Sequence, residues 1–228
     1  MITVKQVVDL TRPISDDVAM WPGTPAPEFE TRFMLERDGF YARRVSLWEH
    51  TATHIDAPAH FIQGGRSVDM LDPGTLVRPA VVIDVETACA ANPDYLFCAD
   101  DVLRFEAEHG TVPAGSAVLA RTGFDRLESD RERYMGPPAE LHFPGFGEDA
   151  ARLLVERGVA GIGIDTLSTD FGAASVFSVH GVILGAGCWQ LEGLVNLDQL
   201  PPLGALLVIG ALPLAGGSGA PARVLALL

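Results

Sequence analysis

One eleven-residue segment, from His50 to His60, constrains the fold of this chain more than any other. It reads His-Thr-Ala-Thr-His-Ile-Asp-Ala-Pro-Ala-His and places its ligand-type side chains only at even positions, namely His50, His54, Asp56 and His60. In extended backbone successive side chains alternate between faces, so these four project to one side. A helix would separate Asp56 from His50 and His54, and the two threonines and the proline also favour extended chain or loop. The pattern predicts that one cation, or a close pair, is held from one side.

The spacing of the first two histidines adds a local requirement. Along a straight strand His50 and His54 would lie about 13 Å apart, whereas a zinc–nitrogen bond is only about 2.0–2.1 Å. The segment therefore predicts a bend or bulge at residues 51–53. A single histidine is most often an ordinary surface or core residue, and one His-x-x-x-His pair is weak evidence. Four ligand-type groups of one parity, in a chain with six histidines, favour a metal site.

Composition limits the classes of partner. The 228 residues are 48% apolar with a formal charge of -14, which disfavours nucleic acid or an anionic membrane as partner. Three cysteines form neither a disulfide framework nor a Cys-x-x-Cys pair. No basic-then-apolar leader opens the chain, and the longest apolar run, 203–214, is too short to span a bilayer. These features predict a cytoplasmic protein with a single domain over residues 1–228.

Hydrophobic patterning predicts alternating strands and helices. Strands are expected over 4–10, 41–49, 79–85, 116–122, 162–165 and 204–214, and a glycine-rich turn with a final strand over 215–228. Helices are expected over 101–109, capped by Asp100 or Asp101, and over 148–157. The second helix, a glycine stop and the strand that follows form a compact αβ unit. In the next segment His180 and Glu192 are polar groups in a largely apolar stretch, where a lone charge is costly. A metal would relieve that cost.

The His50–His60 segment resembles the His-x-Gly-Thr-His-x-Asp-x-Pro-x-His signature of the cyclase family of metal-dependent hydrolases. That family includes bacterial kynurenine formamidases and isatin hydrolases. The chain departs from the signature at Ala52, where the family usually has glycine; a methyl group there is tolerable unless the backbone needs a positive φ. Looser similarities lie at Trp21-Pro22-Gly23, Phe143-Pro144-Gly145, Gly163-Ile164-Asp165 with Ser168 and Asp170, and Gly219 to Arg223.

The resemblance implies a fold and a set of roles. The fold is an α/β arrangement of the swivelling β/β/α type with a mixed, partly barrel-like sheet, commonly assembled as homodimers or homotetramers. His50, His54 and Asp56 would bind one metal, and Asp56, His180 and Glu192 would hold or bridge to a second where two are present. His60 would be the catalytic acid/base and Trp21 would line the substrate pocket. From the residues alone, His60 can instead be a ligand and Trp21 can pack on the core.

Histidine and carboxylate ligands without cysteine suit Zn²⁺, one or two per chain, or alternatively Mn²⁺. Such an ion lowers the pKa of bound water from 15.7 to about 7 and polarises a carbonyl. The expected activity is hydrolysis of a small amide by the resulting hydroxide, with His60 handling the proton. N-formyl-L-kynurenine, giving formate and kynurenine, is the first substrate hypothesis. Thr24 follows Trp-Pro-Gly where a typical kynurenine formamidase has aspartate, which weakens that hypothesis.

Two alternatives remain open from the sequence. One is ring opening of a cyclic amide such as isatin, or of a lactone, by the same groups. The other belongs to a different class, a non-catalytic metal- or ligand-binding protein, in which His60 would have no use. Serine-hydrolase chemistry is disfavoured because Gly216 to Ala220 lacks the closing glycine of a nucleophile elbow.

Overall fold

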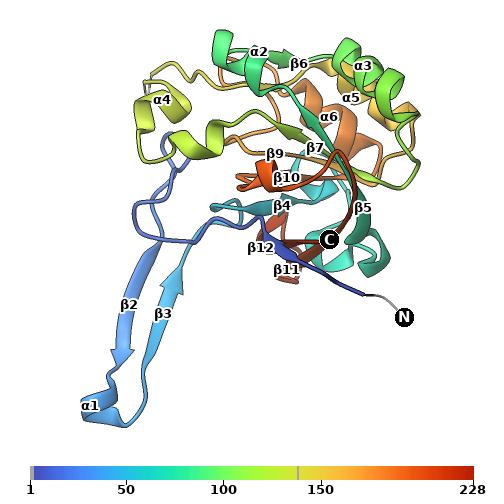
Figure 1. Ribbon diagram of the computed structural model, residues 1–228. Helices are drawn as coiled ribbons and strands as arrows, with labels where there is room; N and C mark the ends of the chain where they lie inside the picture. Colours follow the sequence, from blue (N-terminus) through green and yellow to red (C-terminus); the bar gives the residue numbers. More distant parts are fainter. Residues whose placement is uncertain (1–2, 138) are drawn as a thin grey trace.

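Most strands of the chain join one mixed sheet that closes into a barrel (Figure 1). The computed structural model describes residues 3–137 and 139–228. The strand order is β1-β12-β11-β5-β7-β9-β10-β4, and β4 also pairs with β12, so seven strands close on themselves while β1 adds to β12. The strands of this sheet are β1 (Val7–Asp9), β4 (His54–Asp56), β5 (Val77–Asp84), β7 (Ala117–Arg121), β9 (Gly161–Ile164), β10 (Trp189–Glu192), β11 (Leu203–Ala211) and β12 (Gly219–Leu227). The mixed, partly barrel-like α/β fold predicted from the sequence is confirmed.

The two faces of the sheet build two separate cores. In β5, Ala80 and Val82 point into the barrel, and Val81 and Ile83 point out towards the helices. The barrel interior leaves little space at Gly161, where an added Cβ would lie 2.3 Å from the ring of Trp189. Small residues on the inner face therefore let the strands close around large side chains.

Helices cover the outer face of the sheet on one side (Figure 1). They are α2 (Glu86–Ala91), α3 (Ala99–His109), α4 (Arg131–Met135), α5 (Glu148–Glu156) and α6 (Ser178–Gly185), with β6 (Leu96–Phe97) paired to β8 (Gly145–Phe146) beside them. Short 3-10 turns are η1 (Pro58–His60), η2 (Val68–Met70), η3 (Pro73–Thr75), η4 (Phe124–Leu127) and η5 (Leu197–Gln199). Each strand and helix expected above matches an element within a few residues, and the glycine-rich turn expected at the start of 215–228 precedes β12.

One hairpin stands apart from this body. β2 (Glu28–Phe33), α1 (Leu35–Asp38) and β3 (Ala42–Ser46) form a two-stranded ribbon that projects away from the barrel (Figure 1). We call residues 28–46 the arm. No helix within the described residues is long and apolar enough to cross a membrane.

Candidate metal centre

Four separate elements, and the chain just before the first of them, bring the candidate metal-site residues together on the outer face of the sheet. β4 and β10 are antiparallel neighbours, with His54 opposite Glu192 in the register. Ile55 and Leu191 point into the barrel, so the residues on either side of them project to the opposite face, towards α6. The chain before β4, β4 itself, η1, α6 and β10 contribute, in that order, His50, His54 with Asp56, His60, His180 and Glu192.

The bend predicted at residues 51–53 is present at Ala52. Its φ is +56°, one of two positive values among the non-glycine residues that the structure describes. This left-handed turn brings the rings of His50 and His54 to a centroid separation of 5.2 Å. It also aims the carbonyl of Ala52 at the His54 ring, whose Nδ1 lies 3.0 Å away. The family's usual glycine is thus replaced by a residue that this backbone strains.

Two carboxylates lie at the centre of the cluster. Asp56 Oδ1 is 2.6 Å from His50 Nδ1 and 3.3 Å from His54 Nε2. Glu192 is 3.4 Å from Nε2 of both His54 and His180, and Asp56 Oδ2 is 3.6 Å from His180 Nε2. Thr169 N–H donates to Glu192 Oε1 at 2.8 Å and fixes that carboxylate. Asp56 is fully buried, and His54, His180 and Glu192 are nearly so.

Each of three histidines has an outer partner on one ring nitrogen. His54 Nδ1 lies 3.0 Å from the Ala52 carbonyl, and His180 Nδ1 lies 2.6 Å from Asp170 Oδ2. His50 Nε2 lies 2.9 Å from Ser218 Oγ. A carbonyl and a carboxylate can only accept, so the N–H of His54 and of His180 points outward.

The outer partner of His50 is the hydroxyl of Ser218, and Glu49 fixes the direction in which that hydroxyl donates. Ser218 Oγ–H donates to Glu49 Oε2 at 2.6 Å, so the same hydroxyl oxygen accepts from His50 Nε2–H. The bare nitrogens, His50 Nδ1, His54 Nε2 and His180 Nε2, then face the two carboxylates. An outer partner that fixes the tautomer is the usual support of a metal-ligating histidine.

The bare histidine nitrogens and the carboxylate oxygens that face one another need a positive charge between them. Buried His54 Nε2 and Asp56 Oδ2 have no hydrogen-bond partner, and an unsatisfied buried polar atom costs roughly 1–3 kcal/mol. A divalent cation with nitrogen and carboxylate ligands satisfies both atoms at once. The residues present therefore fit the metal that the sequence predicted.

Ligand atoms close enough to share an ion fall into two overlapping groups. One is His50, Asp56 and His60, and the other is His54, Asp56 and Glu192, each with its atoms within 4.8 Å of one another. Asp56 belongs to both, as a bridging carboxylate would. The first group contains His50 and the second contains His54, and His60 is near enough to ligate, so the alternative role for His60 stays open.

Burial and the carboxylates shift the pKa values of these rings in opposite directions. Burial lowers the pKa of His54, but Asp56 and Glu192 outweigh it and raise that pKa to about 10. Burial also lowers the pKa of His180, but hydrogen bonds to Asp170, Asp56 and Glu192 outweigh burial and raise that pKa well above its usual value. For His60 burial dominates and lowers the pKa to about 4. Its ring stacks on His50 at a centroid distance of 4.0 Å.

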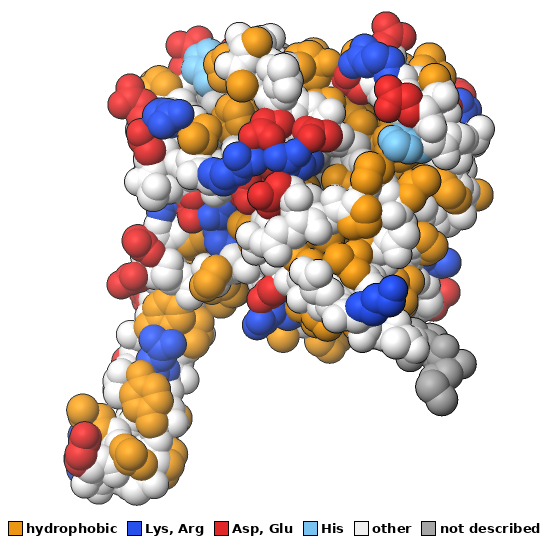
Figure 2. Space-filling model, in the orientation of Figure 1, with side chains coloured by type: hydrophobic (Ala, Val, Ile, Leu, Met, Phe, Trp, Pro, Cys, Tyr) orange, Lys and Arg blue, Asp and Glu red, His pale blue; other side chains and the backbone are white. Residues whose placement is uncertain are grey.

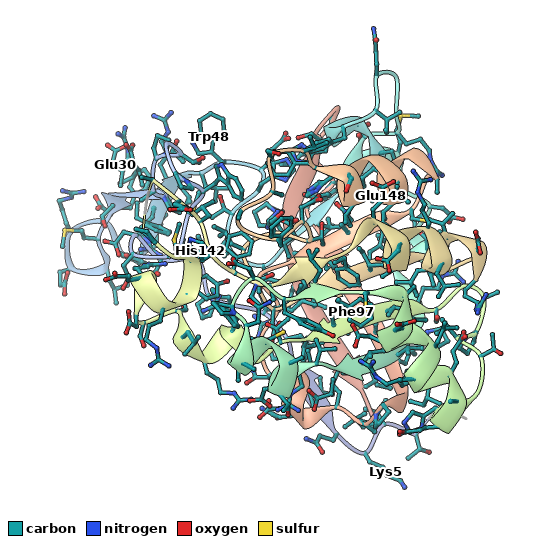
Figure 3. The ribbon with its side chains drawn as sticks, turned by 90° about the horizontal axis from the view of Figure 1, so that it is seen from above. Lys5, Glu30, Trp48, Phe97, His142 and Glu148 are labelled. Atoms are coloured by element: carbon teal, nitrogen blue, oxygen red, sulfur yellow. The ribbon has the colours of Figure 1, made fainter. Side chains whose placement is uncertain are left out.

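A cavity of about 390 Å³ opens directly onto the cluster. Its aromatic walls are Trp21, Trp48, Phe61 and Phe177, and Thr24 also lines it. Trp21 lines the cavity and also packs edge-on against the core residue Phe143, with ring centroids 6.4 Å apart. Trp21 therefore contacts both the cavity and the core, as the two interpretations of its role from the sequence require. Figure 3 shows Trp48 on the same side of the molecule as Glu30 of the arm, away from Glu148 at the start of α5.

Sequence reasoning missed several of these groups. Glu49 and Ser218 lie 169 residues apart and nothing in their spacing connects them, although Ser218 is in the glycine-rich turn that was dismissed as a nucleophile elbow. Phe61 and Phe177 carry no local signal beyond being aromatic and near site histidines. Asp170 was noted only through the family resemblance, and its contact with His180 now explains its place.

A closed mixed barrel bearing a buried histidine–carboxylate cluster at the base of a cavity defines a metal-dependent hydrolase. Comparisons with known proteins agree. The family described as "Putative cyclase" matches residues 8–171. The chain belongs to this cyclase family.

Its relatives include two named activities. An isatin hydrolase from Roseibium aggregatum is 36% identical over 220 residues, covering 90% of this chain and 82% of the relative. A kynurenine formamidase from Bacillus mycoides is 27% identical, covering 96% and 95%. Among solved structures, an isatin hydrolase bound to the product analogue thioisatinate has a TM-score of 0.92 at 34% identity, covering 98% of this chain and 92% of that one. A potential metal-dependent hydrolase with cyclase activity has a TM-score of 0.76 at 28% identity, covering 97% of each.

Proposed function

We propose that this protein hydrolyses a neutral cyclic aryl amide of the isatin class, opening the ring to a carboxylate and an aromatic amine. The observation that carries the proposal is the charge of the cavity wall. Outside the histidine–carboxylate cluster, the residues lining the described cavity are aromatic, aliphatic or hydroxyl-bearing, and none is lysine or arginine.

That wall distinguishes the two substrate hypotheses. N-formyl-L-kynurenine carries an α-carboxylate and an α-ammonium group, and burying either without a partner is costly. A flat neutral bicycle needs only apolar walls, which Trp21, Phe61 and Phe177 supply. Thr24 lines the same cavity and offers no negative charge to an ammonium group. The greater similarity to the isatin hydrolase, 36% against 27% identity, points the same way.

Each group of the cluster would have a role in this reaction. When bound, a divalent cation, Zn²⁺ or Mn²⁺, would make water nucleophilic near neutral pH and polarise the amide carbonyl. Asp56, His54, His180 and Glu192 would hold it, with His50 beside them. The water oxygen forms the new bond to the carbonyl carbon, and the carbon–nitrogen bond of the ring breaks. A ring nitrogen of His60 takes the proton from water and returns it to the leaving nitrogen.

The surroundings of His60 support that role. It lies in η1, just past β4, and its ring is 5.7 Å from that of His180 and stacked on His50. It lines the cavity, so a substrate can reach it. A ring with its pKa lowered to about 4 by burial is neutral at pH 7 and can accept a proton.

The test is a substrate panel on metal-reconstituted protein. Purified protein loaded separately with Zn²⁺ and Mn²⁺ is assayed with isatin, N-formyl-L-kynurenine and a simple aryl lactone. The proposal expects the highest kcat/KM with isatin. Kynurenine formamidase activity, the second candidate supported by the 27–28% identical relatives, predicts N-formyl-L-kynurenine instead. Stoichiometric metal with no turnover of any of the three would favour a metal- or ligand-binding protein.

A further inference from the structure

We propose that Ser218, whose hydroxyl is directed by Glu49, is a positioning residue that makes His50 a metal ligand through Nδ1. The turn at residues 215–218, which precedes β12, would then set how tightly the cluster binds its cation. The proposal rests on the part of the proposed function that puts a divalent cation in this cluster, and it does not depend on which substrate is hydrolysed. His50 lies in the bend before β4, whereas the other cluster residues belong to strands or helical turns, so its position needs a separate explanation.

His50 faces the cluster with a different ring nitrogen from His54 and His180. Those two rings turn Nε2 to the carboxylates, at 3.3–3.6 Å, and Nδ1 outward. His50 turns Nδ1 inward, 2.6 Å from Asp56 Oδ1, and Nε2 outward, 2.9 Å from Ser218 Oγ. The nitrogen that a metal can take is set by the hydrogen bond made at the other nitrogen, so for His50 that choice depends on Ser218.

Two tautomers of His50 compete, and they differ in what they leave for a cation. A neutral imidazole carries one N–H and one lone pair. With the proton on Nε2, the Nδ1 lone pair and both Asp56 oxygens remain available to a metal. With the proton on Nδ1, that N–H donates to Asp56 Oδ1 across the same 2.6 Å, which occupies a ligand atom of both residues at once. The second tautomer therefore opposes metal binding.

Glu49 and Ser218 select the first tautomer. A carboxylate can only accept, so Ser218 Oγ–H donates to Glu49 Oε2 at 2.6 Å, and its lone pair accepts the Nε2–H of His50. Glu49 Oε2 also accepts the Ser218 N–H at 2.8 Å, which holds the hydroxyl beside its acceptor. Neither Glu49 nor Ser218 is among the residues that line the described cavity, so they would act through His50 and not on a substrate.

The same turn also holds the His50 ring. The Ala57 N–H donates to the Ser218 carbonyl at 2.9 Å, and Gly219 pairs with Asp56 in the register of β12 and β4. A Cβ added at Gly219 would lie 2.6 Å from Cε1 of His50, so the ring packs directly against the backbone there. These contacts leave the ring little room to move, and the position of its proton is the variable that remains.

A second serine–carboxylate pair holds this turn without a hydrogen bond to a histidine of the described chain. Ser67 Oγ–H donates to Asp69 Oδ1 at 2.6 Å, and that oxygen accepts the Gly216 N–H at 3.0 Å. Ser67 and Asp69 thus hold the turn with the same kinds of contact as Ser218 and Glu49. Loss of Ser67 would loosen the turn without changing the tautomer of His50, which makes Ser67→Ala a matched control.

A metal titration would report on this cluster. Within the described residues, three or more ligand atoms within 4.8 Å of one another occur only there. Figure 2 shows acidic and basic side chains interleaved on one face of the molecule. Exposed carboxylates are neutralised in pairs such as Arg121 with Asp84 and Arg126 with Glu86, which makes them poor competitors for a cation.

The first test measures Zn²⁺ affinity without substrate. Metal-free protein competes with a chelating dye for Zn²⁺ at one fixed pH. Ser218→Ala should raise the Kd by about 10–100-fold, the usual cost of losing the outer partner of a metal-ligating histidine, whereas Ser67→Ala should bind as the unaltered protein does. Glu49→Gln should also weaken binding although it keeps Ser218, because an amide can donate to Ser218 Oγ and turn the hydroxyl towards Nε2. Unchanged affinity in Ser218→Ala, or an equal loss in Ser67→Ala, overturns the proposal.

The second test locates the proton of His50 directly, and its main measurement needs no variant. In the Zn²⁺-loaded unaltered protein, ring ¹⁵N NMR spectra should show His50 protonated at Nε2, with Nδ1 bound to the metal. In Ser218→Ala, Nδ1 should carry the proton in a measurable fraction of molecules, which a loosened turn alone would not produce. His50 protonated at Nδ1 in the loaded unaltered protein contradicts the proposal.

These readouts separate the proposal from the proposed function. If the unaltered protein binds no Zn²⁺, both fail together. Equal Zn²⁺ binding by the unaltered protein and by Ser218→Ala rejects the proposal alone. Zn²⁺ binding with the expected differences, but no turnover of isatin, N-formyl-L-kynurenine or an aryl lactone, rejects the proposed function alone.

Discussion

Ala52→Gly should make this protein more stable, which is the reverse of the usual effect of glycine. Ala52 has a φ of +56°, a region in which an L-residue costs roughly 1–2 kcal/mol. Glycine removes that cost, but its greater conformational freedom in the unfolded chain lowers the free energy of unfolding by roughly 0.4–1 kcal/mol. The difference predicts a gain of about 0.5–1 kcal/mol in the free energy of unfolding, or roughly 1–4 °C in Tm for a chain of this size.

Ala59→Gly is the matched control. Ala59 is half-buried like Ala52, lies in η1 of the same segment and has no positive φ. There glycine should lose about 0.5–1 kcal/mol. Both variants and the parent are unfolded in urea at one fixed metal concentration, because bound metal adds its own stability by mass action. Opposite signs for the two variants support the strained turn.

The same sign for both would refute the reasoning. If Ala52→Gly destabilises as Ala59→Gly does, then the left-handed turn at Ala52 is either absent or unstrained. The account of how His50 and His54 approach each other would fail with it. Repeating the measurement in a chelator separates backbone strain from any change in metal affinity.

Four further outcomes follow from the site and the core. His54→Ala should lose metal and activity together, and elemental analysis with full occupancy would contradict its assignment as a ligand. His60→Ala should keep its metal but lose at least about a hundredfold in kcat, the usual scale for general acid–base help, and a variant with retained rate would remove His60 from that role. Thr24→Asp should raise kcat/KM for N-formyl-L-kynurenine relative to isatin by about tenfold, since a charge-assisted contact to the ammonium group is worth about 1.4 kcal/mol or more. An unchanged ratio would contradict the inference that the uncharged cavity wall selects a neutral substrate. Burial raises the pKa of Asp165 from 3.8 to about 6, so the folded state holds this proton more tightly than the unfolded state. The free energy of unfolding should therefore fall by roughly 1–3 kcal/mol as pH rises from about 4 to 6. Asp165→Asn should remove that pH dependence in urea unfolding, and a dependence that persists in the variant would have another origin.

The local part of the site could be predicted because it depends on short-range geometry. Even spacing in extended backbone puts His54 and Asp56 on one face, and the reach of two ligands to one ion requires the bend found at Ala52. Continuous apolar runs likewise predicted the buried strands β5 and β7.

The remaining parts depend on tertiary packing that no spacing reports. His180 and Glu192 come from a helix and a strand, and their approach to Asp56 follows from how α6 packs on β10. The outer partner of His50 depends on the turn before β12. The sequence also predicted Asp100 or Asp101 as the N-cap of the 101–109 helix. In the structure Cys98 is the N-cap of α3, and the Asp101 carboxylate accepts the Cys98 N–H.

The arm was only half predicted for a related reason. The expected strand at 41–49 corresponds to β3, but β2 was not expected. Both strands are exposed along most of their length, so neither shows the one-sided burial that produces a readable alternation.

The most direct test of the central claim is anomalous diffraction from crystals grown with a divalent cation, measured on both sides of that metal's absorption edge. We expect an anomalous peak about 2.0–2.2 Å from Nε2 of His54 and from a carboxylate oxygen of Asp56 and of Glu192. Crystals in which those three side chains are splayed apart, with no anomalous peak among them, would contradict the account.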